Sequence, residues 1–229
     1  MPTSPTRLLV RDELIGFARS KVMLVLWLVL PCLALLGYLL IPARVFGGAG
    51  AHMTATAFMR VLEGSLAGTV AGLMIAVDLV SERNRNVYVL LVIRPIRREA
   101  IVWAKFLAVF GCVAIACIVS VLLGMVIDAV RGVPPTAASL YETGKALVSM
   151  TTVVAMSTAA GALFGVVART IVVAVILVLY VGQNIAIIPM LPMSLGVLPD
   201  HFWLFMVLSL VLVAILLGVA ARVFRRAQL

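Results

Sequence analysis

Long apolar stretches without a charged residue constrain the fold of this chain more than any other feature. Five of them reach the roughly 20 residues that a helix needs to cross a bilayer, at residues 22–43, 106–127, 146–168, 170–199 and 201–221. A sixth, residues 64–77, reaches spanning length only if it includes Arg60, Glu63 and Asp78. The hydrocarbon core offers backbone groups no water, and uninterrupted apolar runs exclude the alternating pattern of a barrel. The sequence therefore predicts an all-α integral membrane protein with six transmembrane helices.

The composition agrees with a membrane protein. Only 12% of the residues are charged, against about a quarter in soluble domains. A cleaved signal peptide is the competing interpretation of the first apolar run, because Ala49-Gly50-Ala51 resembles a cleavage site. The run is longer than a signal h-region and follows about twenty polar or mixed residues, which favours an uncleaved helix.

Lysine and arginine are distributed unequally between the two sides of the predicted spans. Fourteen of the 18 fall on the side that carries both termini, which the positive-inside rule assigns to the cytoplasm. The net charge of +9 therefore requires no nucleic-acid partner, although the basic rim would attract anionic membrane lipids. The other four lysines and arginines, on the opposite side, are Arg44, Arg60, Arg131 and Lys145.

The expected organisation is a single transmembrane domain, residues 1–229. An amphipathic helix at residues 4–21 begins at Ser4-Pro5 and is expected to lie in the membrane interface. Three prolines between residues 189 and 199 predict a break near Pro189. The predicted segments are the spans 22–43, 57–80, 100–128, 146–168, 170–188 and 202–222, an outer loop before the fourth span, a cytoplasmic segment at 81–99 and a broken outer segment at 189–200.

No group of residues indicates catalysis. A phosphate-binding G-x-x-x-x-G-K-[ST] loop is absent from the sequence, and no nucleophile with a base is recognisable. The three cysteines fall within predicted spans and have no metal-binding spacing. Glu63 and Asp78 would lie about 22 Å apart, near opposite ends of one span, so they form no ion relay. We expect no enzyme activity, metal or cofactor in this chain.

Small residues recur at four-residue spacing in two predicted spans. Gly64, Gly68 and Gly72 lie in the second span, and Gly161 and Gly165 in the fourth. Such stripes let helices in lipid approach closely. The two stripes are consistent with an interface between subunits and also with helix packing within one subunit.

The cytoplasmic segment VSERNRNVYVLLVIRPIRRE, residues 80–99, concentrates charge around a short apolar run. As a helix it would place Val87, Leu90 and Leu91 on one side, with Arg83 and Arg94 extending the stripe. Pro95 would end or turn this helix. A short amphipathic helix of this kind suits either a groove on a partner protein or the lipid surface.

This segment resembles that of the ABC-2 type ABC-transporter permeases, whose pattern runs roughly E-R-x-x-G-T-x-E-x-L-L-x-x-P-I-x-R-x-E with a Lys shortly after. Asn86-Val87 replaces the usual Gly-Thr, and Val89 stands where an acidic residue is usual. The residues that match are Glu82, Arg83, Leu91, Pro95, Ile96, Arg98 and Lys105.

The resemblance implies a permease subunit of an exporter that pairs with a second copy or a paralogue. A separate cytoplasmic ABC ATPase would bind ATP and Mg²⁺, and the location would be a bacterial-type inner membrane. Spans one, two and five would border the substrate route, and the amino-terminal helix would brace the coupling segment. The residues expected to couple to the ATPase are Glu82, Arg83, Val87, Leu90, Leu91, Arg94, Pro95, Arg98 and Glu99. The alternatives are a mechanical transmitter acting on a protein partner and, less favoured, a stand-alone carrier.

Overall fold

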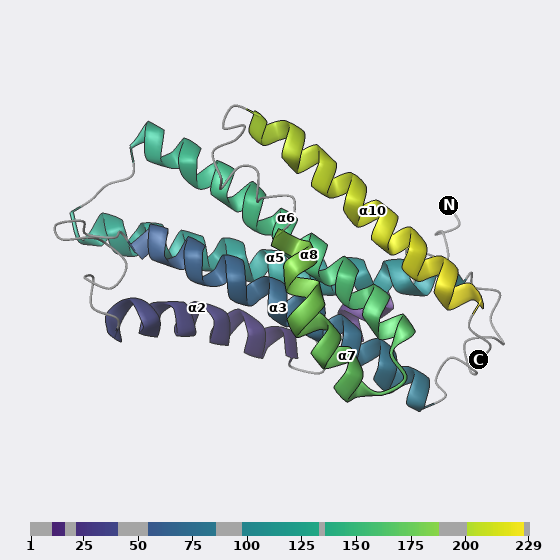
Figure 1. The fold of residues 1–229 in the computed structure, drawn as a ribbon. Helices are drawn as coiled ribbons and strands as arrows, with labels where there is room; N and C mark the ends of the chain where they lie inside the picture. Colours follow the sequence, from purple (N-terminus) through teal and green to yellow (C-terminus); the bar gives the residue numbers. More distant parts are fainter. Residues whose placement is uncertain are drawn as a thin grey trace, which may run out of the picture.

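The computed structural model of the chain describes residues 11–16, 22–40, 55–85, 98–132, 136–187 and 201–226. Every element in these ranges is helical (Figure 1). The main helices are α2 (Val22–Leu40), α3 (Ala55–Asn84), α5 (Arg98–Val130), α6 (Ala137–Val167) and α10 (Phe202–Arg226). Between α6 and α10 lie α7 (Ile171–Leu177), the π-helical turn η2 (Val178–Gly182) and α8 (Gln183–Ile187).

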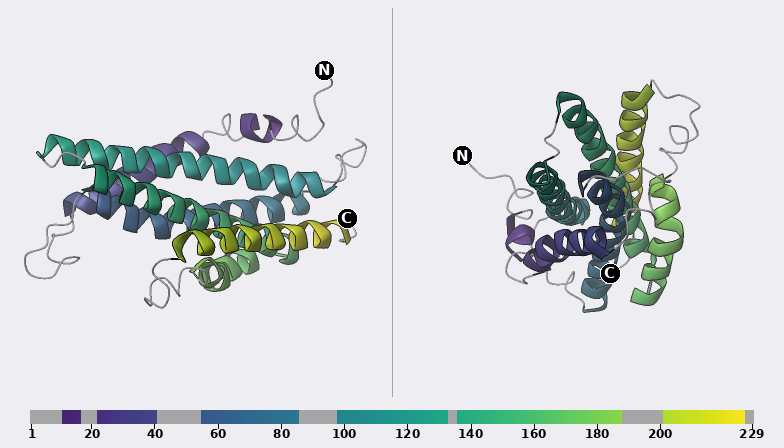
Figure 2. Two further views of the ribbon diagram at one scale, coloured as in Figure 1. Left: turned by 90° about the horizontal axis from the view of Figure 1, so that it is seen from above. Right: turned by 90° about the vertical axis from the view of Figure 1, so that its left-hand side faces the viewer.

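Long helices run side by side and form an elongated bundle. Helix α3 contacts α2, α5 and α6, while α10 packs on α6 and α5 (Figure 1). The path through α7, η2 and α8 crosses α3 and α6 on one side. Residues 11–16 are helical and lie outside the bundle, beside α5 (Figure 2).

Three of the described helices are long and apolar enough to cross a membrane: Glu99–Val130, Ala137–Val167 and Phe202–Arg226. A shorter apolar helical stretch covers Ile171–Ile187. Many large apolar side chains on these helices are exposed, for example Leu122 and Trp203. Such exposure would be unfavourable in water but costs little against lipid chains, which are as apolar as the side chains.

Helix α6 departs from the predicted fourth span. It begins at Ala137, so residues 137–145, which the sequence predicts to be outer loop, are helical instead. The Thr136 side chain explains this start, because its hydroxyl accepts a hydrogen bond from the backbone N–H of Ser139 at 3.2 Å, as an N-cap does. The predicted break near Pro189 and the outer segment 189–200 lie outside the described residues.

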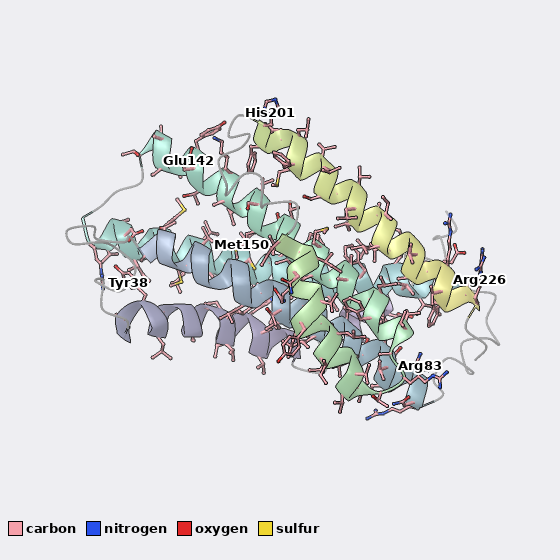
Figure 3. All side chains as sticks on the ribbon, viewed as in Figure 1. Tyr38, Arg83, Glu142, Met150, His201 and Arg226 are labelled. Carbon is pink, nitrogen blue, oxygen red and sulfur yellow. The ribbon has the colours of Figure 1, made fainter. Side chains whose placement is uncertain are left out.

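The two ends of the bundle carry different side chains. Arg83 and Arg226 lie toward the right-hand end in Figure 3, whereas Tyr38 and Glu142 lie toward the left-hand end. The first end also holds the start of α5 and the end of α10, which an ion pair joins. This end, called the basic end below, holds the described flanks of the predicted coupling segment, the end of α3 and the start of α5.

Candidate functional site

The predicted coupling segment is described at its two flanks. Helix α3 continues to Asn84 and therefore carries Glu82 and Arg83 on its last turns. Helix α5 begins at Arg98 and carries Glu99 in its first turn. The segment thus connects the ends of two long helices. The remaining predicted coupling residues, Val87, Leu90, Leu91, Arg94 and Pro95, lie outside the described residues.

A buried lysine lies next to the first flank. The Lys105 side chain on α5 is only 1% exposed, and its Nζ lies 2.6 Å from Asp78 Oδ2 and 2.8 Å from Glu82 Oε1. Asp78 and Glu82 are four residues apart, so they lie on the same face of α3. A third carboxylate comes from Glu13, whose Oε1 is 3.2 Å from the same Nζ. We call Lys105 and these three carboxylates the Lys105 cluster.

The Lys105 cluster explains how an apolar helix tolerates a buried charge. Burying an ammonium group is unfavourable unless it is paired and hydrogen-bonded. The three N–H groups of Lys105 can satisfy this requirement, because Asp78, Glu82 and Glu13 each supply an oxygen within hydrogen-bonding distance. Loss of one partner from a buried pair typically costs about 3–5 kcal/mol. The Lys105 cluster therefore joins α5 to α3 and to residues 11–16.

Glu13 is the member of the cluster that lies on the amino-terminal segment. Burial raises the pKa of its carboxyl above the ordinary value of 4.5. Lys105 opposes this shift, while the negative charges of Glu82 and Asp78 add to it. Leu14 and Ile15, by contrast, are exposed. The segment therefore faces the bundle with its carboxylate and leaves these two apolar side chains available to lipid.

Arg83 contacts another helix. Its guanidinium donates to the carbonyl of Val166 at 3.0 Å and to the carbonyl of Ala168. These carbonyls lie at the carboxyl end of α6, where backbone acceptors lack partners within the helix. Arg83 thus joins the end of α3 to the turn between α6 and α7 (Figure 3).

The second flank is held by a surface ion pair. Arg225 Nη1 on α10 lies 2.9 Å from Glu99 Oε1 on α5, and both side chains are exposed, at 60% and 41%. Water screens such a pair, so it contributes about 0.2–1 kcal/mol. The first flank of the coupling segment is therefore held more strongly than the second.

Asp128 is a polar contact at the opposite end that the sequence analysis did not identify. Its carboxylate accepts hydrogen bonds from the backbone N–H groups of Ala55 at 2.7 Å and Thr56 at 2.8 Å, and from the Thr56 hydroxyl. These N–H groups begin α3, so a carboxylate from α5 caps a second helix and complements its dipole. The sequence did contain a signal for this contact, because Asp128 is a single acidic residue at the end of the apolar span predicted at 100–128.

The predicted glycine stripes meet within one subunit. A Cβ placed on Gly161 of α6 would lie 2.3 Å from the carbonyl oxygen of Gly72 on α3, and one on Gly165 would lie 2.9 Å from Ala76 Cα. A Cβ on Gly68 would lie 2.9 Å from the Ser157 hydroxyl. Gly64 has nothing within 4 Å. Of the two interpretations, packing within the subunit accounts for the glycines at the α3–α6 contact.

No grouping of three or more His, Cys, Asp or Glu residues in the described ranges has the arrangement of a metal site.

In the predicted span at 170–188, the Asn184 amide donates to the carbonyl of Tyr180 on its own helix. The side-chain nitrogen of Gln183 is buried and has no hydrogen-bond partner in the structure. The Asn184 contact therefore lies within one helix and joins no second helix.

Comparison with known proteins is consistent with this picture. No match was found among curated proteins. The family described as "ABC-2 family transporter protein" matches residues 9–184, well over half of the 229 residues. The matched region includes residues 11–16, the Lys105 cluster, the coupling segment and the α3–α6 contact. The chain therefore belongs to the ABC-2 transporter family and is a multi-pass membrane protein of an ABC transporter.

Proposed function

We propose that the chain is the permease subunit of an ABC exporter, with six spans and both termini in the cytoplasm. A separate cytoplasmic ATPase binds ATP and Mg²⁺ and moves the coupling segment, residues 82–99. Two permease subunits, identical or paralogous, form the substrate route in a bacterial-type inner membrane. Membership of the ABC-2 family is the observation that carries this proposal, because its permeases work with cytoplasmic ABC ATPases.

The contacts at the basic end support the coupling role. The first flank ends in the Lys105 cluster and in the Arg83 contact with α6, and the second flank ends in the Glu99–Arg225 pair. A push on the segment would therefore reach α5, α6 and α10 through direct contacts. Transmission through a packed bundle also requires that the contacting helices have a second discrete arrangement, which movement of the segment would favour.

Glu82 and Arg83 are poor positions at which to test ATPase docking. Both side chains hold the bundle together, so reversal of their charges would disturb the permease itself. The apolar stripe of the segment offers a better test, because helices dock into grooves through such residues. Leu91 lies in this stripe and also matches the family pattern.

The test is co-purification from mild detergent, with the accompanying ATPase identified by mass spectrometry. We expect the Leu91→Glu variant to lose the ATPase while its thermal unfolding midpoint is retained. The matched control is Leu140→Glu, the same change at an exposed leucine near the start of α6, at the opposite end of the bundle. Equal recovery of the ATPase with both variants would overturn the assignment of the coupling segment.

A further inference from the structure

The Lys105 cluster contains more negative than positive charge. Three carboxylates surround one ammonium group that is 1% exposed, while the carboxylate side chains of Glu13, Asp78 and Glu82 are 24%, 33% and 26% exposed. Asp78 and Glu82 together already outnumber the charge of Lys105. An ionised Glu13 therefore meets attraction from Lys105 of α5 and repulsion from Asp78 and Glu82 of α3.

The three carboxylates are not held equally. Asp78 and Glu82 share one face of a long helix and approach Lys105 Nζ within 2.6 and 2.8 Å, whereas Glu13 lies at 3.2 Å on a separate segment. If Glu13 leaves, Lys105 keeps two carboxylate partners, so no unpaired ammonium remains in the interior. Removal of Asp78 or Glu82 would instead disturb the contact between α3 and α5. Glu13 is thus the partner that the cluster can lose most easily.

We propose that residues 11–16 form a reversible strap, which detaches from Lys105 and rebinds it as Glu82 moves with the coupling segment. The link to ATP-driven movement rests on the proposed function, whereas the detachment itself rests on the Lys105 cluster. Because the cluster carries excess negative charge, the strap binds more tightly when Glu13 is protonated. The raised pKa of the Glu13 carboxyl, caused first by burial, agrees with this direction. Binding of the strap is therefore strongest at low pH and weakens as pH rises through the raised pKa.

The test is hydrogen–deuterium exchange of the full chain in lipid nanodiscs, read on peptides that cover residues 11–16. The Glu13→Gln variant keeps an oxygen acceptor for Lys105 and removes the third negative charge. We expect its exchange at pH 7 to be slower than that of the wild type by about fivefold or more, the factor that a small change in local stability produces. It should also lose the pH dependence of the wild type, after correction for the intrinsic effect of pH on amide exchange.

Two further variants serve as controls. Asp12→Asn removes one negative charge from the adjacent, exposed residue and should change the exchange by less than about twofold. Glu13→Lys places a like charge beside Lys105 and should give the fast exchange of a detached strap. Exchange of Glu13→Gln that equals the wild type would show that the charge of Glu13 does not weaken binding of the strap. Acceleration as in Glu13→Lys would show that this charge holds the strap in place. Either result would overturn the proposal.

A second arm uses the permease with its co-purified ATPase. ATP and vanadate should accelerate exchange of residues 11–16 in the wild type but not in Glu13→Gln. An equal change in both proteins would show that the strap moves independently of Glu13 and would refute the mechanism. Absence of any ATPase would instead contradict the proposed function and leave the variant comparison in the isolated permease as the test of the strap.

Discussion

At the scale of single residues, the basic end depends on one lysine. Lys105 is surrounded by apolar helix and is paired with carboxylates from α3 and from residues 11–16. Buried ion pairs often contribute little net stability compared with apolar replacements, but removal of one partner is costly. Lys105 therefore acts as a positioning residue whose loss leaves three negative charges in one poorly hydrated site.

We predict that Lys105→Met lowers the free energy of unfolding by about 3 kcal/mol, the lower end of the range for a broken buried pair, because the carboxylates keep some contact with water. The thermal unfolding midpoint of the purified permease in detergent would measure this loss. Lys145→Met is the matched control, since Lys145 forms a 3.5 Å surface pair with Glu142, and it should cost less than about 1 kcal/mol. A Lys105→Met protein as stable as the control would show that the cluster is not needed for folding.

At the scale of helices, α3 and α6 approach each other closely enough for their backbones to touch. Gly72 and Gly161 bring the two backbones together, and Ser157 and Ala76 continue the contact on either side. Without a hydrophobic driving force between helices in lipid, close packing of this kind supplies much of the attraction. The contact also places the carboxyl end of α6 within reach of Arg83.

Gly161→Ala should destabilise the bundle, because its methyl group would lie 2.3 Å from a backbone oxygen that can move only if the helices separate. We expect a loss of about 1–3 kcal/mol, as for other overpacked interiors. Gly64→Ala has open space around its methyl group and should be neutral or stabilising by up to about 1 kcal/mol, the helix preference of alanine over glycine. Thermal unfolding of both variants measures the difference, and equal midpoints would contradict the assignment of the contact.

Helices and their packing stripes were largely accessible from the sequence, because apolar length and small-residue spacing are local properties. The helical stretch 137–145 was missed because Pro134 and Pro135 precede it and it mixes polar with apolar residues. The hydrogen bond that caps it at Thr136 is visible only in the structure. The Lys105 cluster was missed for a different reason. Asp78 and Glu82 have the spacing of one helical face, but Glu13 is 92 residues from Lys105, and only tertiary packing brings them together.

At the scale of the whole molecule, the two ends of the bundle are held by different contacts. One end is held by Asp128 and by a bond from Arg131 to the Tyr38 hydroxyl at 2.7 Å. The basic end is held by the Lys105 cluster, Arg83 and the Glu99–Arg225 pair, and the coupling segment joins it. This arrangement suits a subunit that receives movement at one end and transmits it along packed helices.

The most direct test of this account is the rate of ATP hydrolysis by the co-purified ATPase, measured alone and with the permease in lipid nanodiscs. We predict that the wild-type permease changes the rate and that candidate export substrates change it further, whereas Leu91→Glu leaves it at the value of the isolated ATPase. Identical rates with and without the wild-type permease, or transport that continues when the ATPase is absent, would contradict the central claim that nucleotide hydrolysis in a partner drives this subunit.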